Sequence, residues 1–99
     1  MSTNAKNYLE KISRKLTLGA AIRAIRLCEE ESQTAFAKKL NISTQYLCDL
    51  EHNRKIMSPK KAKCFAEILG YAPEQFVALA IQDSLDHDGL HMLVEVKAA

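Results

Sequence analysis

The chain has 99 residues, which suits one domain with a modest hydrophobic core, and its formal net charge is +2. Residues 1–63 hold 13 Lys and Arg against 6 Asp and Glu, or +7, whereas residues 64–99 hold 1 against 6, or −5. This asymmetry favours a polyanion as the partner of the N-terminal two-thirds. The chain lacks an apolar run long enough to span a bilayer and a secretory signal pattern, so we expect a cytoplasmic protein without membrane contact.

The first part of the chain contains two helical patterns of different strength. Residues 5–16 space apolar side chains for one stripe, but they are also basic and polar. Residues 1–16 are therefore expected to form either a docked helix or a mobile basic arm. A stronger apolar pattern predicts a first core helix over residues 18–29.

Two short helices follow, separated by a tight turn. Ser32 is a good N-cap for a helix that ends near Leu40, and Asn41 tolerates the left-handed conformation that ends a helix. Ser43 can cap the next helix, which we expect over residues 44–52.

Two further helices begin with a proline. Ser58 caps the first of them, Pro59 occupies its first turn and Gly70 ends it. Pro73 opens the second, whose centre, "FVALAI", is apolar on every side. Such a helix must be enclosed, and in so small a domain it is expected either in the core or at a partner surface.

Apolar residues alternate near the C-terminus in a pattern that predicts a β-strand over "LHMLVEVK". A single strand is unstable in water, so it needs the same strand of a second copy or the edge of another protein's sheet. We expect the dimer or partner contact to comprise Phe76, Val77, Leu79, Leu90, Met92, Val94 and Val96.

The two short helices fit a helix-turn-helix, with the small residue Ala37 at their crossing and the second helix in the DNA major groove. Gln45 can make a bidentate contact to adenine, and Thr44 can bond a base or a phosphate. Tyr46 can reach a phosphate oxygen. Gln33 lies at a helix N-terminus, where backbone N–H groups and the helix dipole favour phosphate.

Basic residues follow the second short helix, at Arg54 and Lys55, and would supply the salt-dependent part of DNA binding. Asp49 opposes this charge; it could accept from a cytosine amino group, or it could have a structural or partner-facing role. We expect the DNA contact to comprise Gln33, Ser43, Thr44, Gln45, Tyr46, Asp49, Asn53, Arg54 and Lys55.

Enzyme and metal chemistry are not expected. Cys28, Cys48 and Cys64 lie far apart in the sequence, without a His at ligand spacing, and are predicted to be small buried hydrophobes. The chain lacks a nucleophile turn, a glycine-rich phosphate loop and clustered carboxylates. We therefore predict no catalytic residue, no metal and no cofactor.

At "SQTAFAKKLNISTQYLCDLEHNRK" the sequence resembles the lambda-repressor-like helix-turn-helix family, also called the Cro/C1 or xenobiotic-response-element type. The resemblance covers residues 17–81. It includes a Gln that opens the second helix, Gln33, and a Glu shortly before basic residues, Glu51. Asn53 replaces the glycine usual in the family, which keeps a positive φ accessible at some cost.

The later segment, "SPKKAKCFAEILGYAPEQFVALAIQDSL", is similar to a subset of that family, the HigA-type antitoxins. This resemblance implies an antitoxin that binds a neighbouring toxin protein and, as a dimer, its own operator. A C-terminal strand used for dimer contact is also similar to HipB-like antitoxins.

Together these features predict an all-α, five-helix lambda-repressor-like domain with a C-terminal β-strand used in dimerisation. Its parts are an arm or helix at 1–16, a helix-turn-helix domain at 17–84 and a strand or tail at 85–99. The expected function is that of a repressor that binds a two-fold operator in double-stranded DNA as a homodimer, and that serves as the antitoxin of a toxin-antitoxin pair. The alternatives are a stand-alone phage-type or metabolic repressor, and a protein that mainly neutralises another protein.

Overall fold

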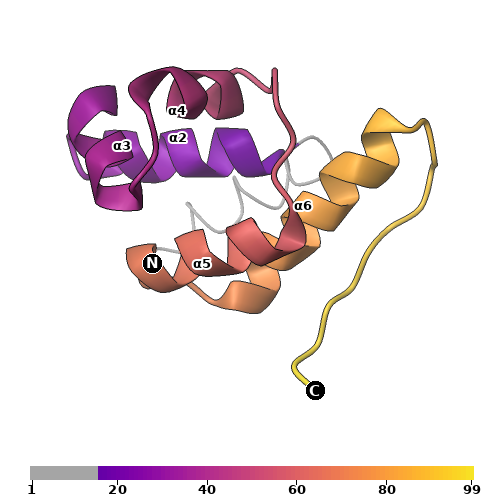
Figure 1. The fold of residues 1–99 in the computed structure, drawn as a ribbon. Helices are drawn as coiled ribbons and strands as arrows, with labels where there is room; N and C mark the ends of the chain where they lie inside the picture. Colours follow the sequence, from indigo (N-terminus) through magenta and orange to yellow (C-terminus); the bar gives the residue numbers. More distant parts are fainter. Residues whose placement is uncertain (1–15) are drawn as a thin grey trace.

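The computed structural model describes residues 16–99, and the prediction of an N-terminal arm or helix falls almost entirely outside this range. Within it the fold is all-helical (Figure 1). The helices are α2 (Leu18–Cys28), α3 (Gln33–Leu40), α4 (Thr44–Glu51), α5 (Pro59–Leu69) and α6 (Pro73–His87). The predicted all-α class and the five helices of this region are confirmed, with ends within about two residues of those expected.

Local hydrogen bonds explain where the helices begin and end. Four hydroxyl side chains accept the backbone N–H three residues ahead, at 3.0 to 3.2 Å: Thr17, Ser32, Ser43 and Ser58. Each satisfies a donor that the first helical turn leaves free. Asn41 ends α3 with φ 59° and Gly70 ends α5 with φ 79°, both in the left-handed region.

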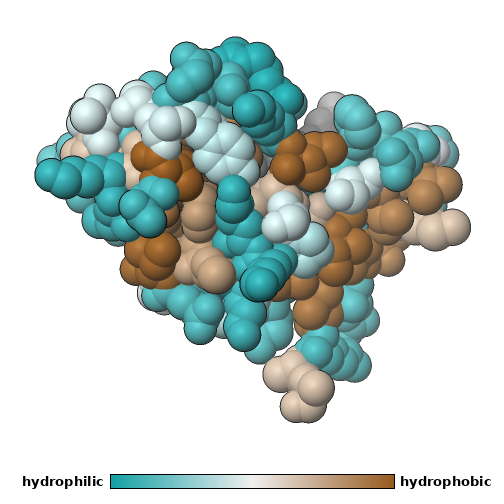
Figure 2. Space-filling view, viewed as in Figure 1, coloured by the Kyte–Doolittle hydropathy of each residue, from teal (hydrophilic) through white to brown (hydrophobic). Residues whose placement is uncertain are grey.

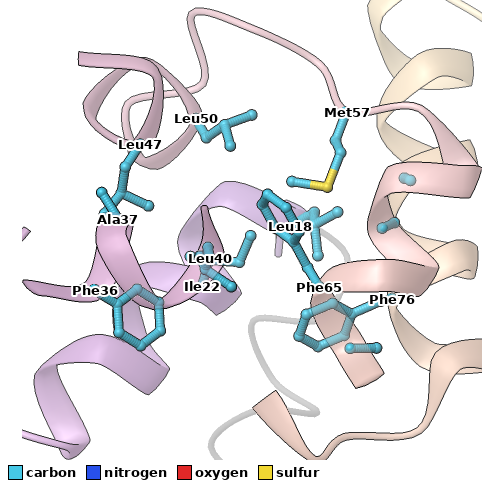
Figure 3. Close-up of a cluster of buried hydrophobic side chains, with 13 residues drawn as sticks. Leu18, Ile22, Phe36, Ala37, Leu40, Leu47, Leu50, Met57, Phe65 and Phe76 are labelled. Carbon is cyan, nitrogen blue, oxygen red and sulfur yellow. The ribbon is translucent and has the colours of Figure 1, made fainter. Parts of the chain in front are cut away.

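The helices pack around one hydrophobic core (Figure 3). In Figure 1, α4 lies over α2, while α5 and α6 pack against each other on the other side of α2. Side chains from every described helix enter the core, as does Met57 from the loop between α4 and α5. Its largest members are Leu18, Ile22, Phe36, Leu40, Leu47, Leu50, Phe65 and Phe76.

The backbones of α2 and α4 meet at Gly19. A Cβ atom built at this position would lie 1.8 Å from the carbonyl oxygen of Leu50. Only a residue without a Cβ permits this approach. Gly19 therefore determines how closely α4 sits on α2.

The predicted C-terminal strand is wrong for this chain, because the described residues after α6 contain no strand. Instead, the side chain of Gln82 in α6 holds the segment: its Nε2 donates to the Met92 carbonyl at 2.7 Å, and its Oε1 accepts from the Val94 N–H at 2.9 Å. A strand needs a second strand for its backbone groups, and none of the described elements supplies one. One amide side chain pairs with two of these groups instead.

Two of the three cysteine predictions are also wrong. Cys28 and Cys64 are exposed, and Cys48 is half-buried. Cys28 and Cys64 lie beside the apolar stripes of α2 and α5 rather than within them, since Ile22 and Phe65 fill the buried positions. The apolar spacing correctly placed these cysteines in helices, but it wrongly placed Cys28 and Cys64 on the buried faces of those helices.

Candidate nucleic-acid interface

The N-terminal turn of α4 projects polar side chains from a packed base. Ala37 is buried where α3 crosses α4, and Leu47 and Leu50 anchor α4 in the core. Ser43, Thr44 and Gln45 are exposed. The polar start of this helix is therefore held on a rigid base with its side chains directed to solvent.

A chain of hydrogen bonds continues along the exposed face of α4. Gln45 Nε2 donates to Asp49 Oδ1 at 3.0 Å, and Arg54 Nε donates to the same oxygen at 2.9 Å. Lys55 Nζ lies 4.0 Å from Asp49 Oδ2. The hydrogen bond from Arg54 lowers the pKa of the Asp49 carboxyl, and this effect exceeds the opposing effect of partial burial. The Asp49 carboxylate is thus charged, and it is paired with Arg54 of the same chain.

Tyr46 joins the basic loop after α4 to α5. Lys61 Nζ lies 4.6 Å from the centre of the Tyr46 ring and 3.4 Å from its hydroxyl, and Lys55 Nζ lies 5.4 Å from the ring centre. Aromatic faces attract cations, so the half-buried ring gathers two lysines beside α4. Tyr46 therefore holds the positive charges of Lys55 and Lys61 beside α4.

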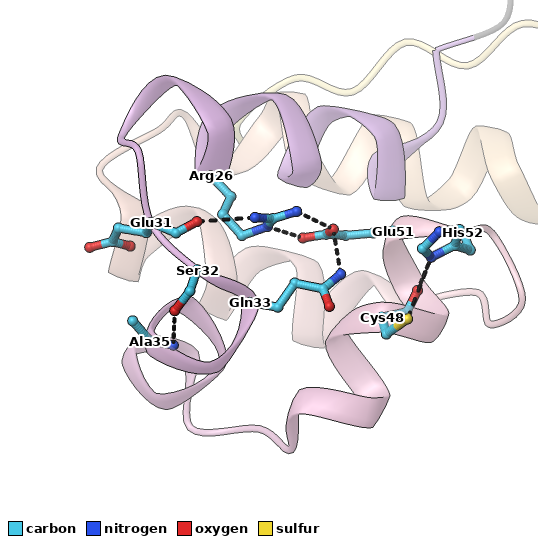
Figure 4. A network of polar contacts seen from close by, with 8 residues as sticks. All are labelled: Arg26, Glu31, Ser32, Gln33, Ala35, Cys48, Glu51 and His52. Carbon is cyan, nitrogen blue, oxygen red and sulfur yellow. Dashed lines mark hydrogen bonds and ion pairs between the residues drawn. The ribbon is translucent and has the colours of Figure 1, made fainter.

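A buried polar network supports α4 from behind (Figure 4). Glu51 is 5% exposed, and its carboxylate accepts from Arg26 Nε at 2.7 Å and Arg26 Nη2 at 2.9 Å. Gln33 Nε2 donates to Glu51 Oε1 at 3.0 Å, and Arg26 Nη1 also donates to the Glu31 carbonyl at 3.0 Å. The side chains of Arg26, Gln33 and Glu51 thus connect α2, α3 and α4.

The sequence did not lead us to predict a role for Arg26, and it led us to predict that Gln33 contacts a phosphate. The structure directs the Gln33 amide nitrogen to Glu51, so this nitrogen is hydrogen-bonded inside the protein. A signal was present: Arg26 and Glu51 stand four residues after the buried Ile22 and Leu47, on the inward side of their helices. Two opposite charges at such positions indicate a buried pair.

Asn53 occupies the left-handed region, with φ 59°, at the end of the turn after α4. Its backbone N–H donates to the Leu50 carbonyl at 3.1 Å, and Arg54 N–H follows with a 2.8 Å bond to the Asp49 carbonyl. This turn brings Arg54 back toward α4. An asparagine thus adopts here the left-handed conformation that glycine adopts most readily.

The predicted dimer or partner residues divide into three groups. Phe76 is 3% exposed and stacks on Tyr71, with ring centres 5.9 Å apart; its assignment to a partner surface is wrong because the ring fills the core. Val77, Leu79, Val94 and Val96 are half-buried. Leu90 and Met92 are exposed, as is Leu93, which is 92% exposed. Hydrophobic residues are visible over α6 and the C-terminal segment in Figure 2.

Residues 16–99 hold no group of three His, Cys, Asp or Glu side chains arranged for a metal ion. None of the helices in this range is both long enough and apolar enough to cross a bilayer. Among protein-family models, curated proteins and solved structures, none matches this chain.

Proposed function

We propose that this chain is a sequence-specific DNA-binding repressor that inserts the start of α4 into the major groove. The observation that carries the proposal is the exposed pair Thr44 and Gln45 at the N-terminus of a short helix whose other face is fully packed. Exposed polar groups at the start of the second helix are those that contact base edges in helix-turn-helix proteins. We also propose that the protein acts in the cytoplasm.

The charge around α4 supports the same proposal. Arg54 and Lys55 have side chains more than half exposed, at 53% and 57%. Lys61 lies close to this pair, because Lys61 and Lys55 both lie over the Tyr46 ring. Cations at these positions can contact the phosphates that flank the groove entered by α4.

The repressor is proposed to act as a homodimer on a two-fold operator. Half-sites are then about one helical turn, or ~34 Å, apart. The molecule measures 34 × 32 × 28 Å, so this spacing is close to the width of one copy. The exposed apolar residues Leu90, Met92 and Leu93 favour the C-terminal segment as the contact.

A second role as an antitoxin is proposed from the resemblance of residues 58–85 to HigA-type antitoxins. The exposed apolar side chains on the acidic C-terminal third favour a protein partner for this region. If neutralisation is a role, a toxin-like reading frame adjoins the gene, and removing residues 90–99 alters formation of the complex with its product. A stand-alone repressor would have neither property.

DNA recognition is tested with the full chain and a duplex containing the region upstream of its own reading frame. Gln45→Ala should weaken specific binding by about 1–3 kcal/mol while sparing binding to a shuffled duplex, because one base contact is lost. Gln75→Ala, a change of the same exposed residue type on α6, should leave both affinities unchanged. Fluorescence anisotropy at fixed salt measures both; equal affinity of the unaltered chain for the two duplexes would refute the proposal.

A further inference from the structure

The side chain of Gln45 is not free on the surface of α4. Its Nε2 donates to Asp49 Oδ1 at 3.0 Å, one helical turn ahead. A carboxylate can only accept hydrogen bonds, so the amide must turn its nitrogen, not its oxygen, toward Asp49. We infer that Asp49 is a positioning residue that fixes the orientation of the Gln45 amide and thereby makes α4 select adenine over guanine. This inference rests on the proposed DNA-binding function.

Asp49 is itself held in place. Arg54 Nε donates to it at 2.9 Å, and the backbone N–H of Arg54 donates to the Asp49 carbonyl at 2.8 Å. The Asp49 side chain is only 15% exposed, whereas that of Arg54 is 53% exposed. Arg54 therefore fixes and neutralises the carboxylate at Oδ1, the same oxygen that accepts from the Gln45 amide.

The fixed amide leaves one edge for a base. The Gln45 nitrogen carries two hydrogens, of which one is used by Asp49. A two-point contact to a base requires that Asp49 accept the hydrogen trans to the amide oxygen, so that the second hydrogen and the oxygen share the opposite edge. Within residues 16–99 neither of these two groups has another hydrogen-bond partner. This edge offers one donor and one acceptor. Adenine presents the matching acceptor N7 and donor N6 in the major groove.

Guanine requires the opposite arrangement. Its major-groove edge has two acceptors, N7 and O6, so a glutamine contacts both only by turning its nitrogen fully toward the base. In this protein that rotation would bring the Gln45 oxygen against the Asp49 carboxylate, where two acceptors repel. Asp49 thus opposes the guanine-compatible orientation. A direct contact from Asp49 to cytosine would have to use Oδ2, because Oδ1 already accepts from Gln45 and Arg54.

The test uses the full chain and a pool of random duplexes at one salt concentration. Sequencing of the bound duplexes identifies the base pair whose preference disappears in Gln45→Ala. At that pair, Asp49→Ala should reduce the preference for adenine over guanine by about three- to ten-fold, the effect of one net hydrogen bond. Asp49→Asn, which keeps an acceptor oxygen, should retain the preference. Asp49→Ser, too short to reach the amide, should act like Asp49→Ala.

Two controls separate positioning from other roles. Lys61→Ala removes a cation that lies over the Tyr46 ring beside α4, and it should weaken binding to all sequences alike without changing the base preference. In the Gln45→Ala background, Asp49→Ala should have no further effect on preference. Thermal melting verifies that each variant is folded at the assay temperature.

The outcomes are distinguishable. The role of Asp49 would be overturned, with DNA recognition intact, if Asp49→Ala and Asp49→Ser both kept the adenine preference. It would also be overturned if Asp49→Ala changed the base preference in the Gln45→Ala background, or if Asp49→Ala removed a preference for cytosine at another base pair. If the unaltered chain enriches no sequence, the proposed DNA recognition fails, and this inference fails with it.

Discussion

The carboxylate of Glu51 is a charge buried in a small domain, and its partners explain why it is tolerated. Burial raises the pKa of this carboxyl, but the hydrogen bonds from Arg26 and Gln33, together with attraction to the charges of Arg26 and Arg23, lower it by more, so the pKa lies below its ordinary value. The Arg26 side chain is also nearly buried, at 11% exposed. Removal of either member leaves the other as an unpaired buried charge.

Glu51→Gln should therefore lower the free energy of unfolding by about 3–5 kcal/mol at neutral pH. Because the folded pKa of Glu51 is depressed, the stabilisation by Glu51 is present above the unfolded pKa of about 4.3 and is lost as the pH falls through the folded pKa. The difference between the variant and the unaltered chain should consequently shrink in acid. Urea unfolding between about pH 6 and about pH 3 measures this difference.

The control is Glu67→Gln on the exposed face of α5, which should change stability by less than about 0.5 kcal/mol. A difference between Glu51→Gln and the unaltered chain that is equally large at both ends of the pH range would contradict the assignment of the depressed pKa.

The exposure of individual side chains was predicted correctly where it follows from their position around a helix. Thr44 and Gln45 stand off the stripe defined by Leu47 and Leu50, and the structure exposes both. The link from Gln33 to Glu51 was not predicted, because the two residues are 18 apart and meet only when α3 packs on α4.

At the scale of elements, the contact between α2 and α4 determines where the exposed turn of α4 sits. Gly19 in α2 meets the backbone of α4 at Leu50, and the pair Arg26–Glu51 joins the same two helices. A close backbone approach and a buried ion pair both resist relative motion of the helices. We therefore expect α4 to behave as a rigid extension of α2.

Gly19→Ala tests this contact. In an exposed helix the change is stabilising, but here the new Cβ would lie 1.8 Å from the Leu50 oxygen and 2.9 Å from its carbonyl carbon. Since backbone cannot rotate away, α4 must shift, and stability should fall by about 1–3 kcal/mol. Backbone amide chemical shifts of α4 should change as well.

Gly70→Ala is the matched control. Its φ of 79° makes the substitution strained, yet its Cβ would meet no atom within 4 Å. The control should lose about 1–2 kcal/mol without changing the shifts of α4. Unchanged α4 shifts in Gly19→Ala would contradict a direct backbone contact.

Elements were predicted well where their determinants are local. The caps at Ser32, Ser43 and Ser58 act within three residues of themselves, so the sequence alone indicates the helix starts. The C-terminal alternation was misleading, because alternation describes side chains, whereas a strand also requires partners for its backbone. In this chain Gln82 meets part of that requirement.

At the scale of the whole molecule, the uneven charge determines which surface can approach a polyanion. The excess of +7 lies in residues 1–63, and the deficit of −5 lies in residues 64–99. Arg54, Lys55 and Lys61 collect beside α4, whereas Lys97 lies in the acidic part and pairs with Glu95 at 3.5 Å. DNA is therefore expected to approach the α4 side.

Lys55→Ala should reduce the slope of log affinity against log salt concentration by about 1, because one phosphate contact and its released counterion are lost. Lys97→Ala removes the same charge from the other part of the chain and should leave the slope unchanged. Titrations of a duplex at several salt concentrations measure both slopes. Equal effects of the two variants would indicate attraction by net charge alone, without an oriented surface.

The sequence by itself determined the helical class, the helix starts and the polar residues that open α4, because each depends on residues within about one helical turn. Only the tertiary structure decided how these side chains are paired. The backbone N–H of Leu18 donates to Asp83 at 3.0 Å across 65 residues, and Arg26 reaches Glu51 across 25. Such partners come together only through packing of the helices, and no local pattern specifies the partner.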